Sequence, residues 1–218
     1  MKTRSYDHLC GLAFALDVVG ERWALLIVRE LLPGPRRFSD LLAGMPGVAT
    51  NTLTTRLEEL EHHGVIARET LAPPAASSVY KLTLKGLRLE PAIVALVRWA
   101  RPDVGRARAE RRRLAPLRAS WLAIALKAFY APGKARGQIV LELPTGSLFV
   151  AVGSAGLQIR DATQSDRPQA RLTCPEDLVI ALVTEEATLA QAARHPKAKI
   201  EGDFKALGRV LTAFRRAP

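Results

Sequence analysis

The segment from Arg36 to Thr83 constrains the fold of this chain more than any other part of it. Apolar spacing and turn residues divide the segment into two helices, a turn and two short β-like runs. The predicted elements, in chain order, are helices at Phe38–Leu42 and Thr50–His62 and strands at Val65–Leu71 and Val79–Leu82. This order is typical of a winged helix-turn-helix, which presents one exposed helix face to a DNA major groove.

The longer of the two helices has a buried stripe and a polar face. Leu53, Leu57 and Leu60 recur at the spacing of one helix face, which predicts contact with a core. The opposite face carries Asn51 and Thr55, and it is flanked by Thr52, Thr54 and Arg56. These side chains suit base edges and phosphates. An ordinary amphipathic surface helix is the alternative interpretation of the same pattern.

An ordered series of short motifs runs from Tyr6 to Ala100. It includes Gly20-Glu21-Arg22-Trp23, Gly34-Pro35-Arg36-Arg37-Phe38, Pro46-Gly47-Val48-Ala49-Thr50-Asn51-Thr52-Leu53 and Tyr80-Lys81-Leu82-Thr83. In these motifs the chain resembles the HxlR family of winged-helix transcriptional regulators. The resemblance implies binding of double-stranded DNA by a homodimer, at a near-palindromic operator. The DNA-contacting residues that we expect are Arg36, Arg37, Ser39, Thr50, Asn51, Thr52, Thr54, Thr55, Arg56, Ser77, Ser78 and Lys81.

The chain departs from the family pattern next to Cys10 and at the wing tip. The residue after Cys10 is Gly11, where the family usually has proline. The expected wing tip, Pro73-Pro74-Ala75-Ala76-Ser77-Ser78, lacks the basic residue that relatives often carry. This second departure weakens the expectation of a contact between wing and phosphate.

Charge and hydropathy agree with a DNA-binding protein without requiring one. The chain has 32 Lys and Arg against 21 Asp and Glu, a net charge of +11, which suits a polyanionic partner. Residues 1–113 have a net charge of +6 and residues 114–218 one of +5, so the excess looks evenly spread. We expect no signal peptide, no membrane span and a cytoplasmic location.

Composition shifts predict two domains and a linker. The predicted winged helix-turn-helix domain covers residues 1–101, and a second domain covers residues 116–218. Between them, residues 102–115 contain Pro102, Gly105 and a dense run of arginines, which predicts a basic linker or an exposed helix. The first helix, Leu9–Val19, carries more apolar residues than one small domain needs, and Trp99 falls on an apolar stripe and is interpreted as core.

The second half of the chain predicts a mixed sheet covered by helices, so the whole chain is of the α+β class. The motifs Leu172-Thr173-Cys174-Pro175-Glu176-Asp177-Leu178 and Ala198-Lys199-Ile200-Glu201-Gly202-Asp203-Phe204 resemble the sterol-carrier-protein-2-like fold. That resemblance implies a tunnel for a hydrophobic small molecule, which would act as an effector. The residues that would line it are Leu148, Val150, Leu178, Leu182, Leu207, Leu211 and Phe214. Apolar patterning does not distinguish such a pocket from a packed core.

Reactive side chains are few. No histidine has a partner at metal-ligand spacing, so we expect no metal, no cofactor and no enzymatic activity. Some members of the resembled family use a cysteine at the position of Cys10 as a redox switch. Here it lies in an apolar segment without an adjacent base, which favours a buried structural role over oxidant sensing.

Two functions remain open from the sequence. The first is a DNA-binding transcriptional regulator with an effector-sensing or dimer-supporting second domain. The second is a lipid-type carrier or protein-interaction module whose winged helix does not read DNA. The polar face of the longer helix favours the first, and the missing basic residue at the wing tip favours the second.

Overall fold

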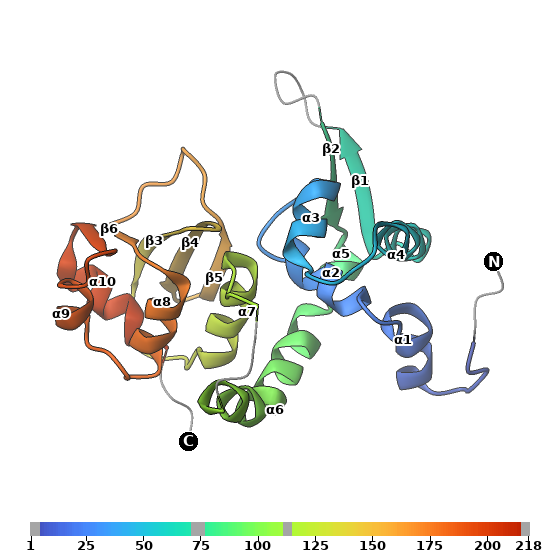
Figure 1. Ribbon diagram of the computed structural model, residues 1–218, viewed down its shortest axis with the longest axis horizontal. Helices are drawn as coiled ribbons and strands as arrows, with labels where there is room; N and C mark the ends of the chain where they lie inside the picture. The colour runs from blue at the N-terminus through green and yellow to red at the C-terminus, as the bar shows by residue number, and fades with distance from the viewer. Residues whose placement is uncertain (1–4, 71–76, 111–114, 215–218) are drawn as a thin grey trace. The chain divides into compact units, whose positions relative to one another are not determined.

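The computed structural model describes residues 5–70, 77–110 and 115–214. The chain divides into two compact units, Met1–Ile93 and Val94–Pro218, each of which builds its own core (Figure 1). The boundary between the units falls inside one helix, α6 (Glu90–Ala109). Across the described residues, no helix combines the length and the apolar character needed to cross a membrane.

The first unit is a winged helix-turn-helix. Its elements are α1 (Gly11–Val19), α2 (Ala24–Leu31), α3 (Phe38–Gly44), α4 (Thr50–His62), β1 (Ile66–Thr70), β2 (Ser78–Leu82) and α5 (Leu84–Leu87). Helix α2 packs against α3 and α4, and α1 packs against α4. The largest fully buried side chains are Ile27, Leu41, Met45, Leu53, Leu57, Leu60 and Ile66. The predicted leucine stripe of the longer helix is therefore confirmed as core.

Two glycines fix the backbone of this unit. Gly47 lies in the turn between α3 and α4 with a φ of 89°, a conformation that residues with a Cβ atom rarely adopt. A Cβ atom on Gly86 would lie 2.2 Å from the carbonyl oxygen of Val65, so only glycine allows α5 to pass this close to the start of the hairpin. The hairpin itself is antiparallel, with Arg68 opposite Tyr80, and its first strand begins one residue later than predicted.

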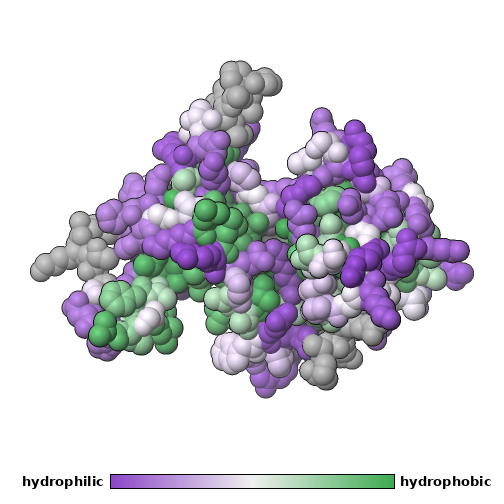
Figure 2. All heavy atoms as spheres, turned by 180° about the vertical axis from the view of Figure 1, so that it is seen from behind, coloured by the Kyte–Doolittle hydropathy of each residue, from purple (hydrophilic) through white to green (hydrophobic). Residues whose placement is uncertain are grey.

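Helix α1 leaves apolar side chains exposed. Leu12 is 68% exposed and Phe14 is 59% exposed, and the preceding Leu9 is fully exposed. Figure 2 shows hydrophobic residues gathered over α1, at the lower left of that view. The helix begins two residues later than predicted, at Gly11, so Cys10 lies before its first turn.

Helix α6 continues through much of the segment that predicts a linker. It includes Pro102, and residues 102–109 of the predicted linker are helical. Proline removes one helical hydrogen bond, but the Arg-Ala-Arg-Ala sequence that follows has high helix propensity. Trp99 on this helix is 77% exposed, so its interpretation as a core residue was wrong.

The second unit contains a five-stranded mixed sheet with the order β5-β4-β3-β6-β7. Strands β3 and β6 are parallel, and the other neighbouring pairs are antiparallel. Besides most of α6, its elements are α7 (Ala119–Phe129), β3 (Gly137–Leu143), β4 (Gly146–Gly153), β5 (Gly156–Asp161), β6 (Ala170–Thr173), α8 (Glu176–Val183), α9 (Leu189–Ala192), β7 (Lys199–Gly202) and α10 (Phe204–Leu211).

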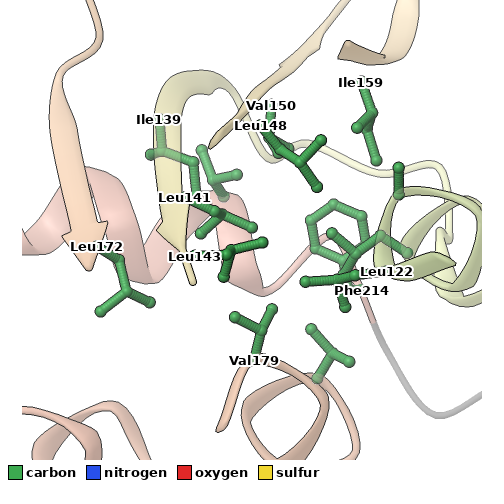
Figure 3. Close-up of a cluster of buried hydrophobic side chains, with 14 of the residues drawn as sticks. Leu122, Ile139, Leu141, Leu143, Leu148, Val150, Ile159, Leu172, Val179 and Phe214 are labelled. Carbon is green, nitrogen blue, oxygen red and sulfur yellow. The ribbon is translucent and has the colours of Figure 1, made fainter. Parts of the chain in front are cut away.

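Helices cover one face of this sheet. Helix α7 packs on β4 and β5, and α10 packs on β3 and β6. Alternate strand residues such as Ile139, Leu141 and Leu172 enter the shared core with Leu122 and Phe214 (Figure 3). The sheet-and-helix architecture predicted for residues 116–218 is confirmed.

The segment between β5 and β6 runs from one end of the sheet to the other. Ala162 donates its N–H to the carbonyl of Ser147 at one end, and Gln169 donates to the carbonyl of Gln138 at the other. Midway, the Asp166 carboxylate accepts two hydrogen bonds from the Arg160 guanidinium. That guanidinium also lies 4.3 Å from the centre of the Phe149 ring, so the segment is tied to the sheet face away from the helices.

Candidate DNA interface

The candidate recognition surface is the exposed face of α4. Thr50, Asn51 and Thr54 are exposed, and Thr52 and Thr55 are half-buried. The opposite side of the helix is held by the buried Leu53, Leu57 and Leu60, which fixes the direction of this face. The structure therefore brings five of the six predicted residues of α4 to one accessible surface.

Two threonines on this face already use their hydroxyl protons. Thr54 Oγ1 donates to the carbonyl of Thr50 at 3.1 Å, and Thr55 Oγ1 donates to the carbonyl of Asn51 at 3.0 Å. Each side chain keeps an acceptor lone pair and a methyl group for a partner. The Asn51 side chain is the amide on this face, and an amide can both donate to and accept from an adenine edge.

Arg56 does not lie with the other predicted residues. Its guanidinium forms ion pairs with Glu59 and, at 3.4 Å, with Glu21 in the turn between α1 and α2. The side chain is 20% exposed, so its charge is already neutralised inside the unit. In this structure Arg56 ties α4 to the α1–α2 turn through these ion pairs.

The start of α3 provides candidate phosphate contacts. Arg37 is exposed at the N-cap, where its backbone N–H donates to the Asp40 carboxylate at 3.0 Å. Ser39 is exposed in the first turn, and Arg36 is half-buried with its backbone paired to Tyr80. These predicted residues lie together, next to the hairpin.

On the wing, the basic residue that lacks a carboxylate partner within the described residues is not the one predicted. Lys81 forms an ion pair with Glu69 across the hairpin. Arg68, which the sequence interpretation missed, is exposed, donates from Nε to Ser78 Oγ at 3.2 Å and lies over the Tyr80 ring. Strand alternation places Arg68 on the same face as the buried Ile66, so the sequence pattern gave no signal of its exposure. Of the predicted wing tip, Pro73–Ala76 lie outside the described residues, and Ser77 is half-buried.

The two cysteines have opposite environments. Cys10 is exposed at the N-cap of α1, and the backbone N–H groups of Ala13 and Leu12 lower the pKa of its thiol. The expectation of a buried Cys10 was therefore wrong, because α1 begins after this residue and the N–H groups of its first turn face the sulfur. Burial instead raises the pKa of Cys174 to about 12.

The predicted tunnel residues lie in or against one packed cluster. Leu148, Val150, Leu207 and Phe214 are buried members of the core, and Leu178, Leu182 and Leu211 are half-buried against it. A hollow of about 750 Å³ lies elsewhere, at the turn between β4 and β5. Its lining includes Gln138, Gln158 and Gln169.

Comparison with protein families finds two matches that together cover most of the chain. The HxlR-like helix-turn-helix family matches residues 18–107. The SCP-2 sterol transfer family matches residues 104–215. The two matches meet within α6.

Individual relatives match the first of these regions. An uncharacterized HTH-type transcriptional regulator of Synechocystis is 37% identical over 89 residues, 41% of this chain and 66% of the relative. The uncharacterized HTH-type transcriptional regulator YvaP of Bacillus subtilis is 38% identical over 39% of this chain and 80% of its own. Among solved structures, the reduced form of the transcriptional regulator YodB from B. subtilis is 31% identical, with a TM-score of 0.39 over 43% of this chain and 92% of that one.

Proposed function

The chain belongs to the HxlR-like helix-turn-helix family and carries an SCP-2 sterol transfer domain, and from that premise we propose that it regulates transcription by binding operator DNA as a homodimer. The observation that carries the proposal is the exposed Asn51–Thr54–Thr55 face of α4, fixed from behind by three buried leucines. Such a protein acts in the cytoplasm, where a chromosome is accessible to it, and the proposal assigns it no catalytic reaction.

Base recognition is assigned to the first two turns of α4. Asn51 reads an adenine edge, and the threonine methyl groups contact thymine methyl groups in the major groove. With Arg56 held by Glu21 and Glu59, the arginine that would read guanine from this helix is engaged. A half-site with an A·T pair opposite Asn51 follows from this arrangement.

Phosphate contacts are assigned to the residues around α4. Arg36, Arg37 and Ser39 contact the backbone on one side. On the wing, Arg68 takes the place that the sequence suggested for Lys81, with Ser77 and Ser78 beside it. These contacts position α4 and contribute affinity that does not depend on sequence.

Dimerisation is assigned to α1 and α6. Leu12, Phe14 and Trp99 are all more than half exposed, and Leu96 is 49% exposed, which is more apolar surface than a monomer usually leaves in water. In the proposed dimer, α1 and α6 of two copies bury these side chains and set two α4 helices about one DNA turn apart, so that the operator is a near-palindrome.

A hydrophobic effector of the second unit is the remaining part of the proposal, and the sterol-transfer family match supports it. The seven side chains that would contact it are the core residues Leu148, Val150, Leu207 and Phe214 and their half-buried neighbours Leu178, Leu182 and Leu211. Because these side chains pack against one another, an acyl chain or sterol has to separate α8 or α10 from the sheet. Native mass spectrometry of the protein extracted from cells, with a thermal-shift panel of lipids, tests this part.

The decisive experiment is selection from random duplex DNA with the full-length protein. We expect an enriched near-palindrome, and Asn51→Ala should cost about 1–3 kcal/mol of operator affinity while leaving binding to unrelated DNA unchanged. Arg56→Ala is the matched comparison on the same helix, and we expect it to lower stability more than base discrimination. Failure to enrich any sequence at moderate salt would overturn the proposal.

A further inference from the structure

Positive charge is divided very unequally between the two units. Met1–Ile93 contains 11 Lys and Arg against 10 Asp and Glu, a net charge of +1. Val94–Pro218 contains 21 against 11, a net charge of +10. The even division inferred from the sequence came from cutting the chain at residue 113, and the structural boundary at 93/94 removes it. The unit with the DNA-reading helix is therefore nearly neutral.

One end of the sheet in the second unit is organised around Gln169. Its side-chain Oε1 accepts the N–H of Gln138 at 3.0 Å, and its carbonyl accepts the N–H of Asp203 at 2.8 Å. Its own N–H donates to the carbonyl of Gln138 at 2.9 Å. These bonds hold the start of β3, the start of β6 and the end of β7 together, so the segments that flank them are neighbours.

Four exposed basic residues flank this junction. Lys134 and Arg136 precede β3, Arg167 precedes β6 and Lys205 follows β7. We call these four residues the basic rim. Arg136 donates to the carbonyls of Gly133 and Ala135, and Arg167 donates to that of Gln164, so both guanidinium groups are oriented but keep their charge.

Carboxylates do not neutralise the basic rim. Within the residues that the structure describes, none of the four forms an ion pair with a carboxylate. The acids nearest in sequence are already engaged: Asp203 accepts from the N–H groups of Lys205 and Ala206 and pairs with Arg209, and Asp166 pairs with Arg160. The field of the rim is therefore available to an external anion.

We propose that the basic rim binds DNA phosphates outside the sequence that α4 reads. The inference rests on the proposed DNA-binding function and adds a second, sequence-independent contact to it. Neutralising phosphates releases counter-ions and supplies much of the affinity of DNA-binding proteins. The first unit has a net charge of only +1, and its Arg56 and Lys81 are paired to carboxylates, which leaves a need for a second source of this term. DNA is favoured over an anionic membrane because the same chain carries a DNA-reading helix.

The test compares two full-length double variants with the same change in charge. Lys134→Gln/Lys205→Gln removes two rim charges whose side chains make no hydrogen bond or ion pair within the described residues. Arg194→Gln/Lys197→Gln removes two exposed charges that lie away from the junction, around the end of α9. Binding to operator and to unrelated duplex is measured over a series of salt concentrations. For the rim variant, the negative slope of log K against log salt should become shallower by roughly 0.9 for each phosphate that the rim no longer neutralises. The slope of the control variant should stay that of the wild type.

Three results separate the possible conclusions. Equal salt slopes for the rim variant and the control would overturn the proposal. A rim-dependent slope in a protein that shows no operator preference would support the rim while the proposed regulatory function failed. Vesicles containing phosphatidylserine supply the third: if the rim variant loses vesicle binding but keeps the wild-type slope on DNA, the partner is a membrane and the proposal is wrong.

Discussion

Leu12 on α1 is 68% exposed, whereas Leu141 on β3 is 1% exposed. The two residues represent a difference that runs through the molecule. The first unit builds a small core and leaves apolar side chains on its first helix, while the second unit gathers its sheet residues into one cluster with α7, α8 and α10. The first unit therefore leaves apolar surface on α1, and the second unit leaves it on α6 while the side chains of its sheet are buried in the core.

The largest expected difference between the two units is in the reactivity of their cysteines. Cys10 is exposed and the pKa of its thiol is lowered, while burial raises the pKa of Cys174 to about 12. Because the thiolate is the reactive form, and reactivity falls tenfold for each unit by which the pKa exceeds the pH, Cys10 should react with iodoacetamide about a thousandfold faster or more. Peptide mass spectrometry over time measures both rates, with Cys10→Ser as control. Comparable labelling of the two sites would mean that the second core is not closed.

Loss of a core side chain should have the next largest effect. Leu141→Ala in the second unit should lower the free energy of unfolding by about 2–5 kcal/mol, because it removes buried contacts and leaves a cavity. Urea denaturation followed by circular dichroism measures this change. Operator affinity at a temperature where the variant stays folded should match that of the wild type. A parallel loss of DNA affinity would show that the second core shapes the first unit.

The exposed leucine of α1 should affect assembly more than folding. Leu12→Ala should weaken the dimer by about 1.5–3 kcal/mol, or roughly 10–100-fold, if this side chain is buried between two copies. Sedimentation at several concentrations gives the dissociation constant. Phe204→Ala is the matched control, because Phe204 is a 46% exposed apolar residue of the other unit. Equal effects of the two substitutions would remove the distinction between the units.

The smallest effect is expected from the ion pair on the outer face of the sheet. The Arg160 guanidinium and the N–H of Thr163 hold the pKa of the Asp166 carboxyl well below its usual range. A carboxyl whose pKa is lowered by folding stabilises the folded state above its ordinary pKa, and that contribution is lost as the pH falls below it.

Asp166→Asn should therefore flatten the pH dependence of stability. Between about pH 5 and pH 2, the free energy of unfolding should fall less steeply for the variant than for the wild type. Urea denaturation at several pH values provides the comparison. Identical slopes would show that the ion pair between Arg160 and Asp166 does not contribute to the pH dependence of stability.

The sequence predicts elements well where local signals and burial agree. The bounds of α4 are those predicted, because a leucine stripe and Gly64 define it, and Asp203 caps α10 as expected. The α9 and β7 elements were not predicted as a helix and a strand. Both are only four residues long, too short for a periodic pattern to identify.

The exposure of the candidate site residues was predicted more accurately than the contacts that they form. Asn51 and the threonines lie on one exposed face, as their spacing indicates. The ion pair of Arg56 with Glu21 could not be predicted, because Glu21 is 35 positions away in sequence and only the tertiary fold brings the two together. For Cys10, a two-residue difference in the start of α1 changed the environment from buried to exposed.

The threonine hydroxyls of α4 have a further consequence for how tightly an operator is held. Thr54 and Thr55 are each fixed by a bond to their own helix, so their rotamers are chosen before any DNA arrives. A side chain that becomes ordered only on binding costs about 0.5–1.5 kcal/mol of conformational entropy. On this helix that ordering has already taken place during folding. Recognition by a preordered surface favours a correct base step, since a threonine must break its bond to the helix to accommodate a wrong one.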